Sequence, residues 1–287
     1  MCSSTRKLVP ITPSVRPAFH HSPIRYHMAA TTLKSLRAGV AKGAPPFACL
    51  TCYDATTARW LARAGVHVLL VGDTAAEVVL GHSRTVDMPL DIAVALTAAV
   101  KRGAPDCVVM ADMPFMSYHA DEAEAIRNAG RFLVEGHADI VKLEVDETFA
   151  PLVAKIVRAG VPVCGHIGSR PQRAALTSGY TGAGRTDEQA QQILRDALAM
   201  QQAGCSMLLL EAVPDAVAAA VLAQTSLPVV GIGAGDACHG QVLVLHDLLG
   251  LTDNPPIFAK PLANLGSAIE NAGKEWVQAV ANRSIKR

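Results

Sequence analysis

Short apolar runs alternate with helix-like stretches along most of this chain, and this alternation restricts the fold more than any other feature. Eight runs are strand-like: 47–54, 66–73, 107–114, 139–145, 161–168, 206–213, 227–235 and 241–250. Six stretches between them are helix-like: 55–64, 88–102, 121–135, 147–159, 187–203 and 214–224. Strands that alternate with helices predict a parallel sheet, and eight such strands predict a closed (β/α)8 TIM barrel. A doubly wound open sheet is the alternative, because the eighth run could equally be a helix.

The composition agrees with parallel strands covered by helices. Half of the residues are apolar and only 4% are aromatic, which suits such a fold better than a β-sandwich. The net charge of +1 gives no overall field that would attract nucleic acid or an anionic membrane. The longest apolar runs are strand-sized, so we expect no transmembrane helix. We therefore expect neither nucleic acid nor a membrane as a partner.

The N-terminal part of the chain differs from the rest. The first acidic residue is Asp54, and residues 1–31 carry Arg, Lys, Ser and Pro without a secretory-type apolar core. Such a leader is similar to a mitochondrial transit peptide, and the alternative is a disordered extension of a cytoplasmic protein. We expect residues 32–287 to form one barrel domain with a C-terminal helical extension, beginning with a short helix near Thr32.

The chain contains seven cysteines. Cys49 and Cys52 have CxxC spacing, but both lie within one apolar run. Reduced, buried thiols are the prediction, and a redox or metal-binding pair is the alternative.

Polar side chains recur where the predicted strands end. These are Asp54, Asp73, Thr74, Asp112, Lys142, Glu144, His166 and Glu211. One such residue is usually a helix cap. Because the reacting groups of (β/α)8 barrels lie at the C-terminal ends of the strands, the repetition favours an active site.

Carboxylates at neighbouring strand ends predict a metal site. Asp73 and Asp112 follow the second and third strands, and two hard oxygen ligands suit Mg²⁺ completed by water and substrate oxygens. Two helix caps are the alternative. Glu144 could join them as a ligand or as a hydrogen-bonding neighbour of the ligands. His166 and Glu211 are candidates for proton transfer or polar recognition, and Glu211, which closes an apolar strand, has the stronger case.

Lys142 and Glu144 lie two residues apart in the run "VKLEV". In a strand this spacing directs both side chains to the same face. They could form a structural ion pair or belong to a reaction centre. The long Gly- and Ser-rich connection 168–186 is typical of a lid or binding loop.

Motifs in order along the chain resemble the ketopantoate hydroxymethyltransferase family. They include "TCYDATTARWLARAGVHVLLVGD", "VKLE", "VPVCGHIG", "LLLEAVP", "LPVVGIGAG" and "FAKPLANLG", and the resemblance runs from about residue 33 to residue 270. It implies a (β/α)8 barrel of the phosphoenolpyruvate/pyruvate superfamily. It further implies hydroxymethyl transfer from 5,10-methylenetetrahydrofolate to 3-methyl-2-oxobutanoate, giving 2-dehydropantoate through a Mg²⁺-stabilised enolate in pantothenate biosynthesis.

The resemblance also implies roles for individual residues. The metal ligands correspond to Asp73, Asp112 and Glu144. The substrate-binding positions correspond to Asp73, Thr74, Asp112, Lys142 and His166, with Thr74 where the family usually has Ser. Glu211 corresponds to the acid/base carboxylate. A large homo-oligomer such as a decamer is implied as well.

Three loops near the expected active site depart from the family pattern. The family's "GDSLGM" becomes "GDTAAE" with Glu77 added, "GLTPQ" becomes "GSRPQ" with Arg170 added, and "GGYKVQGR" becomes "SGYTGAGR". The positions that match metal ligands are unchanged. A diverged Mg²⁺-dependent lyase or aldolase acting on another 2-oxo acid is therefore the main alternative, and a non-catalytic paralogue is a third.

Overall fold

Eight parallel strands close into a barrel in the computed structural model, which describes residues 30–176, 179 and 181–285. The strands are β1 (Phe47–Thr51), β2 (Val68–Val71), β3 (Val108–Asp112), β4 (Ile140–Glu144), β5 (Val163–Gly168), β6 (Met207–Glu211), β7 (Val229–Ile232) and β8 (Gly240–Leu243). The pairing of Phe47 with Gly240 joins the first strand to the last. The predicted TIM barrel is thus confirmed, and the open sheet is excluded.

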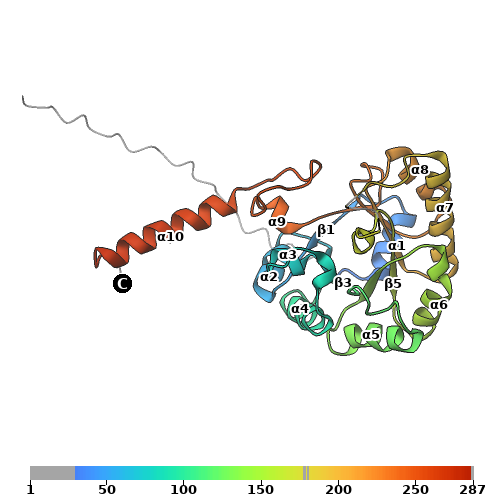
Figure 1. The fold of residues 1–287 in the computed structure, drawn as a ribbon, viewed down its shortest axis with the longest axis horizontal. Helices are drawn as coiled ribbons and strands as arrows, with labels where there is room; N and C mark the ends of the chain where they lie inside the picture. The colour runs from blue at the N-terminus through green and yellow to red at the C-terminus, as the bar shows by residue number, and fades with distance from the viewer. Residues whose placement is uncertain (1–29, 177–178, 180, 286–287) are drawn as a thin grey trace, which may run out of the picture.

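Helices surround the barrel, except that the last helix extends away from it (Figure 1). They are α1 (Leu33–Ala41), α2 (Ala55–Arg63), α3 (Ala75–Val78), α4 (Leu90–Gly103), α5 (Glu122–Val134), α6 (Ala150–Arg158), α7 (Asp187–Gln202), α8 (Asp215–Gln224), α9 (Leu245–Leu248) and α10 (Leu265–Ala281). Three short 3-10 helices lie in the connections: η1 (Thr85–Asp87), η2 (Glu147–Phe149) and η3 (Pro171–Arg173). The six helices predicted between strands all form, because each has an apolar face to bury against the sheet.

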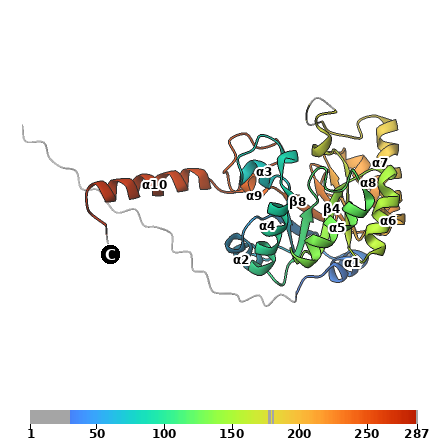
Figure 2. The same cartoon turned by 60° about the horizontal axis from the view of Figure 1, so that its bottom comes forward.

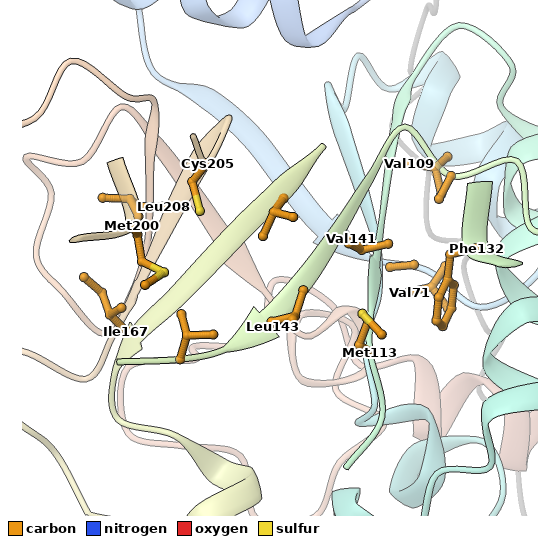
Figure 3. Close-up of a cluster of buried hydrophobic side chains, with 14 of the residues drawn as sticks. Val71, Val109, Met113, Phe132, Val141, Leu143, Ile167, Met200, Cys205 and Leu208 are labelled. Carbon is orange, nitrogen blue, oxygen red and sulfur yellow. The ribbon is translucent and has the colours of Figure 1, made fainter. Parts of the chain in front are cut away.

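Alternation along each strand divides the buried side chains into two layers. Val141 and Leu143 of β4 point outward and belong to one apolar cluster with Phe132 of α5 (Figure 3). Ile140 of the same strand belongs to a separate cluster inside the barrel. Burying one such side chain stabilises the fold by about 1.5–3 kcal/mol. The same alternation turns Lys142 and Glu144 toward the interior.

Helix α1 packs against the interior cluster from the N-terminal side of the chain. Thr32 and Ser35 form a capping box that starts the helix, and Leu36 is buried among the barrel-interior residues. Thr31 N donates a hydrogen bond to the carbonyl oxygen of Asp106, which lies in the turn that leads into β3. The inner layer is therefore covered at the end opposite the strand-end polar residues.

The barrel departs from a regular strand–helix repeat at its eighth unit. No helix lies between β7 and β8, where Gly233 and Gly235 adopt φ of +58° and +73° and allow a tight connection. The eighth predicted run, 241–250, forms a strand only to Leu243 and then the short helix α9. The run changes direction where Leu245 N donates to Thr51 Oγ1 on β1, at 2.9 Å.

Helix α10 extends away from the barrel in both views (Figures 1 and 2). None of its 17 residues is buried. No helix in the described part of the chain is long and apolar enough to cross a membrane. The six cysteines among the described residues are free and buried, as predicted. Cys2 lies outside the described residues, and so does the leader predicted for 1–31 apart from residues 30 and 31.

Candidate active site

A small cavity of about 100 Å³ lies at the C-terminal ends of the strands. Seven predicted site residues line it together: Asp73, Thr74, Asp112, Lys142, Glu144, His166 and Glu211. Asp54, the eighth polar residue at a strand end, is different. It caps α2 by accepting from the N–H groups of Thr56 and Thr57.

Asp73 and Asp112 form a buried carboxylate pair. Asp112 Oδ2 accepts a hydrogen bond from Asp73 N at 3.1 Å, and both residues are less than 10% exposed. Burial raises the pKa of Asp73 to about 7, and the charge of Asp112 adds to the rise. The negative charges of two neighbouring buried carboxylates repel each other, so the pair attracts a cation.

Lys142 supplies one positive charge to this pair. Its Nζ lies 3.1 Å from Asp112 Oδ1 and 3.2 Å from His166 Nδ1. Burial alone lowers the pKa of Lys142, but the carboxylates of Asp112, Asp73 and Glu144 outweigh burial and raise it overall. The side chain is therefore a buried ammonium.

This ammonium determines the tautomer of His166. Burial and the charge of Lys142 lower the pKa of His166, so the ring is neutral. An ammonium can only donate, so Nδ1 accepts and the ring proton is on Nε2. Nε2 lies 3.0 Å from Glu211 Oε2, which places a proton donor beside that carboxylate.

Two backbone conformations position Glu211. Gly168, its partner on β5, has φ of +93°, and a Cβ there would lie 2.6 Å from the Glu211 carbonyl oxygen. Ala212, the next residue along, has φ of +49°, which is unfavourable for a residue with a side chain. The chain thus turns sharply at Glu211, with the side chain at the cavity.

Gln172 connects several of these residues, and no role was predicted for it from the sequence. Its Nε2 donates to Asp73 Oδ2 at 2.9 Å and to the Met113 carbonyl at 3.1 Å. Its backbone N donates to Glu144 Oε2 at 3.0 Å, and its Oε1 accepts from Tyr118 at 2.8 Å. A glutamine after proline in a long loop carries no local signal for such contacts.

Thr74 lines the same cavity as the carboxylate pair. Its Oγ1 accepts a hydrogen bond from the Tyr53 hydroxyl at 3.1 Å, and it makes no capping hydrogen bond to α3. Tyr53 is a second residue without a sequence-based role. The hydroxyl proton of Thr74 is thereby left to donate toward a cavity ligand.

The donor set fits a divalent cation held by two carboxylates. Asp112 Oδ1 is buried, and apart from its ion pair with Lys142 at 3.1 Å it makes no hydrogen bond. Asp73 is the adjacent hard oxygen donor. Across the described residues, no three or more His, Cys, Asp and Glu side chains gather in a metal-holding arrangement. Water and substrate oxygens would therefore supply the remaining ligands, as is usual for Mg²⁺.

The chain is similar to known proteins over most of its length. A family model described as ketopantoate hydroxymethyltransferase matches residues 30–285. The 3-methyl-2-oxobutanoate hydroxymethyltransferase of Pyrobaculum aerophilum is 45% identical over 239 residues, which cover 83% of this chain and 91% of that protein. The protein of the same name from Halorhodospira halophila is 43% identical over 251 residues, covering 88% and 90%.

Solved structures share the fold at low identity. A 2,3-dimethylmalate lyase described as a PEP mutase/isocitrate lyase superfamily member superposes with a TM-score of 0.58 at 17% identity, covering 90% of this chain and 87% of that one. A phosphonopyruvate hydrolase in complex with oxalate and Mg²⁺ gives 0.57 at 13% identity, covering 89% and 100%. These likenesses concern the barrel alone.

Proposed function

The chain belongs to the ketopantoate hydroxymethyltransferase family, and from this membership we propose that it transfers a hydroxymethyl group from 5,10-methylenetetrahydrofolate to 3-methyl-2-oxobutanoate. The product is 2-dehydropantoate, in the biosynthesis of pantothenate. The observation that carries the proposal is the convergence of seven family-matching side chains on one cavity.

Mg²⁺ is the proposed metal, with Asp73 and Asp112 as its protein ligands and Glu144 as a further carboxylate facing it. When bound, Mg²⁺ would act as a Lewis acid that stabilises the enolate of the 2-oxo acid. Gln172 holds Asp73 and Glu144 in place through its side chain and its backbone N, respectively. Because one residue positions both carboxylates, Glu144 is proposed to face the same metal as Asp73.

The substrate is proposed to sit between Thr74 and Lys142. Its carboxylate is negative, and Lys142 is a buried ammonium at the cavity wall. The Thr74 hydroxyl is oriented by Tyr53 as a second donor. Charge-assisted hydrogen bonds of this kind are the stronger ones in a dry cavity.

Glu211 is proposed as the acid/base carboxylate, with His166 as its close polar neighbour. The proton on His166 Nε2 faces Glu211 Oε2, so proton gain and loss at the carboxylate are coupled to the Lys142–His166 contact. Glu211 is also more exposed than the other carboxylates of the cavity. That position suits a group that must reach the incoming substrate.

Solvent exchange of the C3 proton of 3-methyl-2-oxobutanoate tests the proposal directly. In D₂O with Mg²⁺, the protein is expected to replace this proton by deuterium without folate, and to form 2-dehydropantoate once methylenetetrahydrofolate is added. Asp112→Asn should abolish both reactions. Asp54→Asn is the matched control, because Asp54 is a strand-end carboxylate outside the cavity. Absence of exchange by the wild type with Mg²⁺ present would contradict the proposal.

Exchange without folate-dependent product would instead favour the lyase or aldolase on another 2-oxo acid. This second candidate function is supported by Arg170, which departs from the family pattern. Arg170 forms an ion pair with Asp146 at 2.7 Å in the segment 168–173.

We also propose a homo-oligomer, supported by the unburied helix α10. A mitochondrial location is proposed from the acid-free leader alone.

A further inference from the structure

A second, larger cavity of about 390 Å³ lies beside the first. The segment 168–173 separates them, since Gly168, Ser169, Arg170 and Arg173 line the larger cavity while Pro171 lines the smaller one. Ser169 N also donates to the carbonyl oxygen of Glu211. A molecule in the larger cavity would therefore lie across one loop from the proposed acid/base residue.

One face of α7 forms a wall of this cavity. Gln189, Gln192, Ile193 and Asp196 line it at the spacing of successive helical turns. Asp196 is only 4% exposed, and burial raises its pKa. A carboxylate buried at a cavity wall is unusual enough to require an explanation.

A structural role accounts for one of the two carboxylate oxygens of Asp196. Oδ1 of Asp196 accepts from Glu147 N and from Gln192 Nε2, both at 2.9 Å, which caps the start of η2. No hydrogen bond from the described residues reaches Oδ2. Capping thus leaves one acceptor oxygen at the cavity, with its lone pairs available.

The charge around this oxygen favours a neutral ligand with hydrogen-bond donors. Arg170 and Arg173 both pair with Asp146 Oδ2, at 2.7 Å and 3.0 Å. Two guanidinium groups and the carboxylates of Asp146 and Asp196 balance to zero. Asp146 lies outside the cavity lining, so a ligand would meet the Asp196 carboxylate and two guanidinium groups that are already paired. A planar ring that presents N–H donors matches the acceptor oxygen of Asp196.

From this arrangement we infer that the larger cavity binds the pterin ring of the one-carbon donor, with Asp196 Oδ2 accepting from the 2-amino group and N3–H edge. This inference rests on the proposed function, because a reduced pterin is the folate part that must lie near the acceptor substrate. A cavity of this volume lies within the range of small-molecule sites. The segment 168–173 would then contact the ring on one side and the 2-oxo acid pocket on the other.

Direct binding of tetrahydrofolate to the full chain, measured by anaerobic titration calorimetry with Mg²⁺, tests the inference. Asp196→Asn keeps an oxygen for the Glu147 cap but replaces Oδ2 by an amide donor. We expect it to weaken tetrahydrofolate binding at least tenfold. Glu188→Gln, an exposed carboxylate on the same helix outside the cavity, should bind as the wild type does.

A ligand-side measurement needs no variant and decides the matter if Asp196→Asn does not fold. The tetrahydrofolate analogue with methyl in place of the 2-amino group should bind the wild type at least tenfold more weakly than tetrahydrofolate. In a folded Asp196→Asn protein the two ligands should bind alike.

Equal binding of tetrahydrofolate by wild type and Asp196→Asn would overturn the pterin site, as would wild-type affinity for the analogue or no binding at all. The C3-proton exchange of the wild type requires no folate, so it reports on the proposed function separately. Exchange with a failed pterin test would leave the function standing. Failed exchange with a positive pterin test would leave the pterin site standing.

Discussion

Lys142 Nζ lies 3.2 Å from His166 Nδ1, and this contact fixes which nitrogen of the imidazole faces Glu211. Lys142 and His166 come from neighbouring strands, and Lys142 also pairs with Asp112 on its other side. A continuous series of polar contacts therefore runs from the carboxylate pair through Lys142 and His166 to Glu211. The charge state at one end of this series influences proton transfer at the other.

Removing the ammonium should change the titration of His166. In the wild type the pKa of His166 is lowered by burial and by Lys142, so ¹⁵N NMR of labelled histidine should show a neutral ring protonated at Nε2 near neutral pH. Lys142→Met should raise that pKa, because the nearby carboxylates then favour the imidazolium. Lys155→Met, an exposed position on α6, should leave the His166 signals unchanged. An unshifted titration in Lys142→Met would argue against the contact.

Gln172→Leu should lower both stability and turnover. The variant removes the hydrogen bonds of Gln172 to Asp73 Oδ2 and the Met113 carbonyl, which should cost about 2–4 kcal/mol of unfolding free energy. The Tyr118 hydroxyl loses Gln172 but keeps its contacts with the Glu144 backbone. Turnover should fall at least tenfold because Asp73 loses its orientation. Gln202→Leu, an exposed glutamine at the end of α7, serves as control in the same urea denaturation and activity assays. A variant as stable as this control would contradict the bridging role.

Much of the fold and the site was accessible from the sequence, for physical reasons that particular residues illustrate. The eight strands and the outer helices follow from the period of the apolar residues. Lys142 and Glu144 follow from it too, since two polar residues at period two must share the interior face with Ile140.

Residues that act across the barrel were not accessible in this way. Gln172 contacts Asp73, which is 99 positions away, and nothing in the local sequence indicates that loop's path. Asp54 shows the opposite failure, because a helix-capping aspartate and a cavity aspartate look the same at the end of a strand. The end of the eighth strand could not be predicted from the run 241–250 for a related reason. An apolar run can change from strand to helix without a change in hydropathy.

Gly168→Ala should impair catalysis through Glu211. The new Cβ would lie 2.6 Å from the Glu211 carbonyl oxygen and 2.9 Å from Val213, at a φ that disfavours side chains. We expect a stability loss of roughly 1–3 kcal/mol and a larger fall in kcat than in metal affinity, since Asp73 and Asp112 lie on other strands. Gly160→Ala provides the control: its φ is also positive, but open space surrounds it. Comparable kcat in the two variants would argue against a positioning role for Gly168.

The stability of the metal-free protein should decline as pH rises through about 7. The pKa of Asp73 is raised to about 7 in the folded state, above its unfolded value of 3.8. Its contribution is therefore fully present below pH 3.8, where both states are protonated, and declines as the unfolded-state carboxyl ionises. The contribution is lost once the pH has risen through about 7. Asp73→Asn removes this ionisation, so the variant should gain roughly 1–4 kcal/mol relative to wild type at pH 8 and little at pH 4. Thermal melting in EDTA over this pH range measures the difference, and a pH-independent difference would contradict it.

Helix α10 should be required for the native oligomer. Leu265, Ile269, Trp276 and Val280 form an exposed apolar stripe along it, with Trp276 59% and Ile269 58% exposed. Such a stripe on a helix with no buried residue is stable in water only if another surface covers it. The double variant Ile269→Glu/Trp276→Glu should therefore reduce the mass measured by light scattering after gel filtration. Glu275→Gln, on the same helix, should retain the wild-type mass. An unchanged mass in the double variant would place the interface elsewhere on the chain.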